Sequence, residues 1–182
     1  MLMYIYLAEG FEETEMVAPL DLCRRAGIDA KTVSVTGNIY VTGSHGITFK
    51  ADLLASDAGY TPEKADIVML PGGLPGTNGL EASDAVQHAI HKAFDGGKIV
   101  CAICAAPSVL GKAGLLQGKK ATCYPGFEKY LYGATPVSEK VVRDGNVITG
   151  IGMGAAVEFG LEIVSAVCGK ETAEKLKNGI IA

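Results

Sequence analysis

Residues 100–107, VCAICAAP, decide how this chain folds. The range 98–103, KIVCAI, is nearly continuously apolar, as expected for a strand of a parallel sheet that is covered on both faces. Pro107 is suited to the first turn of a helix. The chain therefore leaves a buried strand and enters a helix within a few residues, and Cys104 lies at that junction.

Short β-type runs alternate with helical patterns along the rest of the chain, which is typical of βαβ units around a parallel sheet. The other expected strands cover residues 2–7, 30–35 and 66–70. The expected helices cover residues 12–26, 83–94, 106–114, 153–168 and 171–178. Two hairpins are expected, at residues 39–49 and at residues 141–149, where an Asp-Gly pair marks the turn. The sequence therefore predicts an α/β fold with a parallel sheet.

Length, charge and cysteine content narrow the class of protein. A single domain covering residues 1–182 is expected, because domains commonly run to about 100–200 residues. The formal charge of −4, with scattered Lys and Arg, argues against nucleic acid as a partner. Residues 1–7 are apolar but few and lack a basic head, so neither a signal peptide nor membrane association is expected. Five cysteines, an odd number, favour free thiols and a cytoplasmic location.

Cys104 is the strongest candidate for a reactive group. A side chain at this junction points out at the carboxyl edge of the sheet, where open α/β folds bind their ligands. The start of the next helix adds a positive end and free N–H groups, so a lowered pKa is expected for the thiol. A redox pair with Cys101 is rejected, because residues three apart on a strand are roughly 10 Å apart and disulfide Cα atoms lie within about 7 Å. Cys101 is expected to be a core residue.

A nucleophilic thiol needs donors for an oxyanion and a group that moves protons. Gly72 and Gly73 follow another buried strand, and their N–H groups, with an amide near Cys104, can form an oxyanion hole. The plain alternative for the glycine pair is an ordinary turn. Both interpretations stay open on the sequence alone.

Carboxylates are better candidates than histidines for the proton carrier. Glu12, Glu13 and Glu15 come soon after the first strand, where acids usually serve as partners of the helix dipole. One that stayed protonated beside the thiolate would donate to sulfur and shuttle protons. None of the three histidines is next to Cys104 in sequence, and no metal-ligand spacing stands out. Neither a metal nor another cofactor is expected.

Four segments, in order along the chain, resemble the ThiJ/PfpI superfamily, and specifically its Parkinsonism-associated deglycase branch. They are 7–15 (LAEGFEETE), 24–27 (RRAG), 68–73 (VMLPGG) and 102–107 (AICAAP). The resemblance spans nearly the whole chain. It implies a flavodoxin-like three-layer sandwich that forms a homodimer. It also implies that Cys104 is a nucleophilic, oxidation-prone thiol and that Glu15 is a protonated acid bonded to it.

The activity implied by the resemblance is glutathione-independent conversion of methylglyoxal to lactate, or deglycation of its protein adducts. The Cys104 thiolate would attack a small carbonyl substrate, and Glu15 would move the proton. The N–H groups of Gly73, Cys104 and Ala105 would hold the oxyanion. The alternative is a redox-responsive protective or chaperone-like protein that uses oxidation of the same thiol.

The chain also departs from some relatives around the thiol. Tyr124 stands where some carry a histidine, and His45 stands where some carry an arginine on a hairpin that approaches the partner subunit's site. Ile151 replaces another basic position. These changes make the expected pocket less cationic. Ala105 stands where the protease-like branch has histidine, so peptidase activity is not expected.

Overall fold

The computed structural model describes all 182 residues, which fold around a seven-stranded sheet. The strands are β1 Leu2–Leu7, β2 Asp29–Ser34, β3 Tyr40–Thr42, β4 Thr48–Lys50, β5 Leu53–Leu54, β6 Ile67–Leu70, β7 Ile99–Ile103, β8 Lys120–Ala121, β9 Thr135–Pro136, β10 Val141–Asp144 and β11 Val147–Gly150. The helices are α1 Glu13–Arg25, α2 Leu74–Ala82, α3 Asp84–Asp95, α4 Pro107–Lys112, α5 Ala156–Cys168 and α6 Lys170–Gly179. Three single-turn 3₁₀ helices are η1 Pro62–Lys64, η2 Glu128–Tyr130 and η3 Met153–Ala155. None of the helices is both long and apolar enough to cross a lipid bilayer.

The order of the strands defines the fold. The sheet runs β10-β11-β7-β6-β1-β2-β5, and every neighbouring pair is parallel except β10 with β11. The inner order β2-β1-β6-β7-β11 is that of flavodoxin-like sheets. The predicted α/β, flavodoxin-like fold is therefore confirmed. In such a sheet the connections leave β1 and β6 in opposite directions, which opens a crevice at their carboxyl ends.

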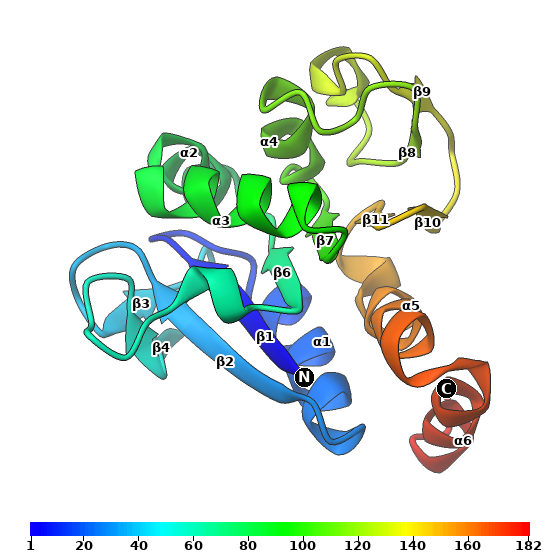
Figure 1. Cartoon of the computed structure of the whole chain (residues 1–182), viewed down its shortest axis with the longest axis horizontal. Helices are drawn as coiled ribbons and strands as arrows, with labels where there is room; N and C mark the ends of the chain where they lie inside the picture. Colours follow the sequence, from blue (N-terminus) through cyan, green and yellow to red (C-terminus); the bar gives the residue numbers. More distant parts are fainter.

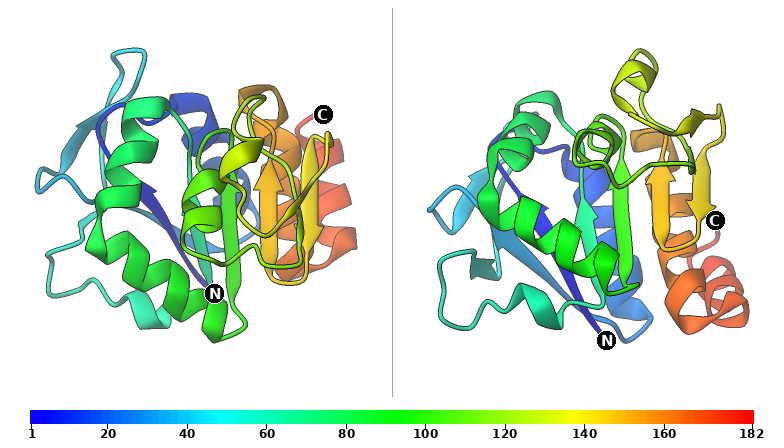
Figure 2. Two further views of the ribbon diagram at one scale, coloured as in Figure 1. Left: turned by 90° about the horizontal axis from the view of Figure 1, so that it is seen from above. Right: turned by 45° about the horizontal axis from the view of Figure 1, so that its top comes forward.

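Helices cover both faces of the sheet, as Figures 1 and 2 show. On one face, α2, α3 and α4 share an apolar cluster with Tyr4 and Tyr6 of β1. On the other face, α1 and α5 share a second cluster with Met3, Ile5 and Leu7 of the same strand, and α6 packs against α5. Successive side chains of a strand point to opposite faces, so a strand buried on both sides must be apolar throughout. This is why β1, β6 and β7 are continuous apolar runs in the sequence.

Both hairpins were correctly predicted. Strands β3 and β4 pair antiparallel, as do β10 and β11. The β3–β4 hairpin is anchored to the loop after β1, because the Gly10 N–H donates to Thr42 O (2.8 Å) and the Ser44 N–H donates to Phe11 O (2.8 Å). The hairpin therefore lies beside the start of α1.

Helix α2 was missed by the sequence analysis. Its glycines lower helix propensity, which masked the pattern. A Cβ added to Gly76 would lie 2.7 Å from Phe11 N, and one added to Gly79 would lie 2.8 Å from the Ala8 Cβ. The glycines are required because α2 packs directly against the backbone that follows β1.

Candidate active site

Three strand ends bring the predicted site residues together at the carboxyl edge of the sheet. Glu15 is in the first turn of α1, Gly72 follows β6, and Cys104 follows β7. The Gly72 N–H donates to Glu15 Oε2 at 2.9 Å. A Cβ added to Gly72 would lie 2.7 Å from the Cys104 Cβ and 2.5 Å from Glu15 Oε2. Only glycine leaves room for the acid and the thiol on either side of this position.

Cys104 has a strained backbone. Its φ is +64°, in the left-handed region that residues with a Cβ rarely adopt, which costs about 1–3 kcal/mol. Two hydrogen bonds hold it: the Cys104 N–H donates to Gly150 O (2.9 Å), and the Tyr124 N–H donates to Cys104 O (2.8 Å). The side chain is half-buried, whereas Ala105 is buried. The strain turns the thiol out of the sheet toward solvent.

Only some of the expected oxyanion donors are free. The N–H groups of Gly73 and Ala105 interact with the Cys104 sulfur and lower its pKa. The Gly72 N–H is occupied by Glu15, and the Cys104 N–H is occupied by Gly150. The expectation that Gly72 and Cys104 donate to an oxyanion is therefore not met. Gly72 holds the acid instead.

Position 73 must also be glycine, for a different reason. Its φ is +88°, and a Cβ there would collide with Gly10 O and lie 2.6 Å from Glu12 N. The positive φ directs its N–H toward Cys104 while the chain turns into α2. This turn supplies one of the two amides that face the sulfur.

Glu15 is the buried acid of the site. It is 1% exposed, and burial raises its pKa to about 7, partly offset by contacts with Cys104, the Gly72 N–H and the Met153 N–H. Its Oε1 atom is buried and accepts no well-aligned hydrogen bond. A pKa near 7 lets Glu15 hold a proton close to neutral pH.

The pKa of Cys104 differs from the expectation. Burial is the largest effect and, with the charge and hydrogen bond of Glu15, it raises the pKa of the thiol to about 12. The predicted lowering by the helix start was wrong in direction, because burial and the adjacent acid outweigh the amides. Burial also disfavours two adjacent negative charges. The thiolate therefore forms when Glu15 carries a proton.

The two expected pocket residues lie in different places. Tyr124 is bonded to Cys104 through its backbone, and its ring Cδ2 lies 3.5 Å from the position of a Cβ on Gly152. His45 is at the turn of the β3–β4 hairpin, where its Nδ1 is 3.0 Å from Glu13 Oε2. The hydrogen bond with Glu13 raises the pKa of His45. Within one chain, His45 is bonded to Glu13 at the start of α1 rather than to the thiol.

Other candidate groups stay outside the site. Cys101 is fully buried in β7, and all five cysteines are free thiols. His88 pairs with Glu63 at the surface (3.0 Å). Ligand atoms of Glu12, Glu13 and His45 lie within 4.8 Å of one another, and this is the one group of side chains that is spaced to hold a metal ion.

The sequence analysis missed two parts of the site, Gly150 and Met153. Gly150 ends the second hairpin and Met153 follows it, and they reach Cys104 and Glu15 only through backbone groups. A contact made by backbone atoms does not depend on which side chain the residue carries, so the sequence does not reveal it. The end of the predicted β-run at Thr149, directly before Gly150, was the only available signal.

Comparison with known proteins agrees with the fold. The family model "DJ-1/PfpI family" matches residues 1–166. Protein dj-1beta of Drosophila melanogaster is 38% identical over 179 residues, which cover 97% of this chain and 95% of the relative. Oxidized DJ-1 of Toxoplasma gondii has a TM-score of 0.93 and 32% identity, covering 99% of this chain and 97% of that one.

Some relatives are longer or have other activities. Protein DJ-1 homolog B of Arabidopsis thaliana is 40% identical over 97% of this chain. The chain spans less than half the length of this relative and of Arabidopsis homolog A, 40% and 45% respectively. Isonitrile hydratase of Pseudomonas putida is 35% identical over 136 residues, covering 74% of this chain and 58% of the relative. The chain therefore belongs to the DJ-1/PfpI family.

Proposed function

We propose that this protein is a cysteine-dependent, glutathione-independent glyoxalase or deglycase that acts on methylglyoxal-type α-oxoaldehydes or their protein adducts. The observation that carries the proposal is the pairing of the half-exposed Cys104 thiol with Glu15, a buried acid whose pKa is about 7. An acid with a pKa near neutrality can both give and take a proton at working pH.

The reaction begins when the Cys104 thiol gives its proton to the Glu15 carboxylate and the resulting thiolate attacks the aldehyde carbon of methylglyoxal. The new alkoxide lies within reach of the N–H groups of Gly73 and Ala105 and takes the proton from Glu15. This gives a hemithioacetal and leaves Glu15 as a carboxylate.

Glu15 then moves a proton between the two substrate carbons. Its carboxylate removes the proton from the former aldehyde carbon and returns it to the neighbouring carbon, while the hydroxyl proton on the first carbon's oxygen passes to the oxygen of the neighbouring carbon, which yields a thioester of 2-hydroxypropanoate. Water cleaves the thioester, releases lactate and restores the thiol. The sum is methylglyoxal plus water to lactate, with no cofactor consumed.

The wider setting is proposed on the same basis. We expect the protein to be a cytoplasmic homodimer. We expect no peptidase activity, because Ala105 offers no side chain that could act as a base. The isonitrile hydratase relative shows that a similar protein catalyses a reaction, which supports an enzyme without naming its substrate.

A second function is supported by the same geometry. Cys104 is half-exposed, and the free amides of Gly73 and Ala105 face its sulfur. These donors, with a protonated Glu15, would stabilise a sulfinate. The protein would then act as a redox-responsive protective or chaperone-like factor.

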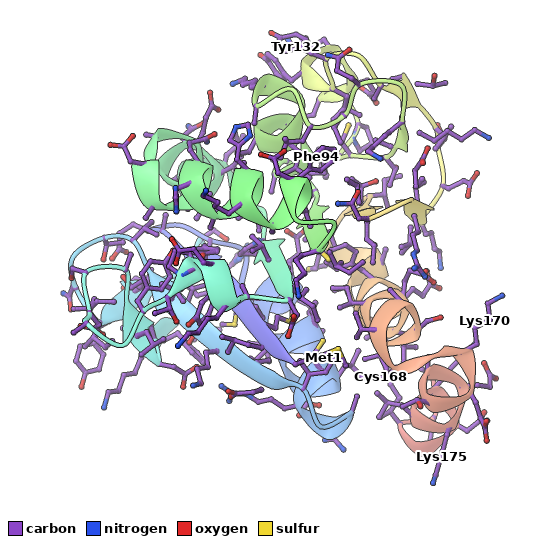
Figure 3. All side chains as sticks on the ribbon, viewed as in Figure 1. Met1, Phe94, Tyr132, Cys168, Lys170 and Lys175 are labelled. Atoms are coloured by element: carbon purple, nitrogen blue, oxygen red, sulfur yellow. The ribbon has the colours of Figure 1, made fainter.

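Lactate formation from methylglyoxal without glutathione tests the first proposal. Cys104→Ser is expected to abolish turnover and Glu15→Gln to reduce it greatly. Cys168→Ser is the matched control, since Cys168 is also a half-buried free thiol but lies at the end of α5 (Figure 3). Absence of parental turnover, together with accumulation of oxidised Cys104 under peroxide, would favour the second function.

A further inference from the structure

A second cavity lies beside the segment that holds the Cys104 turn. Its volume is about 170 Å³, enough for about five water-sized groups. Its walls come from β8, from β9 and from the residues that follow each of these strands (Figure 1), together with Ile151. None of the groups that face the Cys104 sulfur lines it, so the cavity is separate from the candidate active site.

The floor of this cavity carries a hydroxyl group without a partner. Thr122 is 2% exposed, and its Oγ1 atom is buried and forms no hydrogen bond within the protein. The backbone at this position is fixed, because the Thr122 N–H donates to Thr149 Oγ1 at 3.0 Å. A buried hydroxyl without a partner is costly, and most such groups in proteins bond to another group or to an ordered water. The cavity that Thr122 lines is where that partner fits.

The rim of the cavity carries its only formal charge. Glu128 is exposed, and its Oε2 atom accepts the Gly126 N–H at 2.8 Å, which holds the carboxylate in place. No Lys, Arg or His lines the cavity. Burial, and then the charge of Glu128, raises the pKa of Cys123, a second buried residue of the cavity, to about 11. The cavity therefore favours a cation at its rim and disfavours an anion.

Most of the remaining wall is apolar. Pro136, Val137 and Ile151 line the cavity without offering a side chain that forms hydrogen bonds. Such a wall suits a short hydrocarbon segment, as in small-molecule sites where a few polar groups fix the orientation of the ligand. The ligand that satisfies all three features has a hydroxyl group, a short apolar part and a positive charge.

We propose that this cavity binds a small amino alcohol, whose hydroxyl group bonds with Thr122 Oγ1 and whose ammonium group lies beside Glu128. Ethanolamine is a compact member of this class and is protonated at neutral pH. The site uses neither Cys104 nor Glu15, so the inference goes beyond the proposed function and does not depend on it.

Titration of ethanolamine into the isotope-labelled protein tests the proposal, with the chemical shifts of backbone amides as the readout. A ligand this small is limited to weak binding, so we expect saturable shifts at Thr122, Val137 and Ile151 with a dissociation constant of about 1–10 mM. Ethylamine lacks the hydroxyl group, ethylene glycol lacks the charge, and glycolate reverses it. We expect each of these to bind about threefold to tenfold more weakly than ethanolamine, with glycolate the weakest.

Thr122→Val tests the floor, because valine has the shape of threonine without the hydroxyl group. We expect about tenfold weaker binding of ethanolamine and unchanged binding of ethylamine. Thr77→Val is the matched control, since Thr77 is also 2% exposed and has an unpartnered buried hydroxyl group, but lies in α2 and does not line the cavity. Unfolding temperatures should not fall in either variant, because neither hydroxyl group has a partner in the protein.

Glu128→Gln tests the rim, because glutamine keeps an oxygen for the Gly126 N–H and loses the charge. We expect binding of ethanolamine to weaken about threefold to fivefold and binding of ethylene glycol to stay the same. Glu171→Gln removes the same charge from the first turn of α6 and should leave both unchanged.

Absence of saturable shifts at about tenfold the expected dissociation constant would overturn the proposal and leave ordered water as the partner of Thr122. Equal binding of ethylene glycol and ethanolamine would refute the role of Glu128, and equal binding to the parent and Thr122→Val would refute the role of the hydroxyl group. Lactate formation is measured separately, so failure of the binding proposal and failure of the proposed function are distinguishable.

Discussion

Cys101 and Cys104 lie three residues apart at the end of one strand, yet they occupy opposite environments. Cys101 is completely buried in β7, and burial raises its pKa well above that of a free thiol. Cys104 comes three residues later and has a left-handed backbone conformation. The backbone amides of Gly73 and Ala105 and the carboxyl group of Glu15 lie near its sulfur. This difference shows that the strand-to-helix turn, rather than the residue type, creates the candidate nucleophile.

The largest difference between the two cysteines is expected when each is replaced by serine. Cys104→Ser should lower methylglyoxal turnover by about a thousandfold or more, because a serine hydroxyl is a much weaker nucleophile here. Cys101→Ser should keep turnover but lose about 1–3 kcal/mol of unfolding free energy, since it buries an unsatisfied hydroxyl. Lactate assays and urea unfolding measure the two effects. Loss of turnover in Cys101→Ser, with the fold intact, would contradict the assignment.

The packing around the Cys104 turn is tested at Gly72, which follows the neighbouring strand β6. In Gly72→Ala the added Cβ would press on Glu15 and Cys104, so we expect turnover to fall about a hundredfold and stability to fall by about 1–3 kcal/mol. Gly59→Ala is the matched control, because Gly59 has no atom within 4 Å of an added Cβ and no positive φ. Similar losses in both variants would show that the spacing at Gly72 is not what matters.

The acid beside Cys104 should make stability depend on pH. Burial raises the folded-state pKa of Glu15 from 4.5 to about 7, so its stabilising protonated form is fully present below about pH 4.5. That contribution is lost as the pH rises through about 7. Relative to the parent, Glu15→Gln should therefore gain up to about 3 kcal/mol between pH 4.5 and 8.

Urea unfolding of both proteins at several pH values measures this difference. Cys101→Ser serves as the reference, because this variant keeps Glu15 and its loss of stability should therefore be constant over the same pH range. A Glu15→Gln difference that does not change with pH would show that Glu15 is ionised in the folded protein throughout.

The smallest effect is expected at His45. Its ring is bonded to Glu13 at the hairpin turn, so His45→Gln should change methylglyoxal turnover by less than about threefold, in line with the small contribution of exposed ion pairs. A Tyr124→Gln variant provides the contrast, because Tyr124 adjoins Cys104 directly. A large loss in His45→Gln would show that the hairpin reaches a site, either its own or that of a second copy.

The positions of strand ends could be predicted, because the apolar runs of β6 and β7 stop at Pro71 and at the helix start after Cys104. The same reasoning correctly placed Cys101 in the core. The left-handed φ of Cys104 could not be predicted, since cysteine has no preference for that conformation. The direction of its pKa shift was missed because burial and the Glu15 contact are tertiary effects. Helix α2 was missed because its glycines serve packing rather than helix formation.

The hydrogen bond from the Cys104 N–H to Gly150 O has a consequence for the order of events during synthesis. Glu15, Cys104 and Gly150 come from the beginning, middle and late part of the chain. Contacts between distant segments form late, because long loops must close first. A nascent chain that has not yet extended past β11 lacks the acceptor that fixes the turn. The thiol therefore acquires its special environment only after residue 150 has been synthesised.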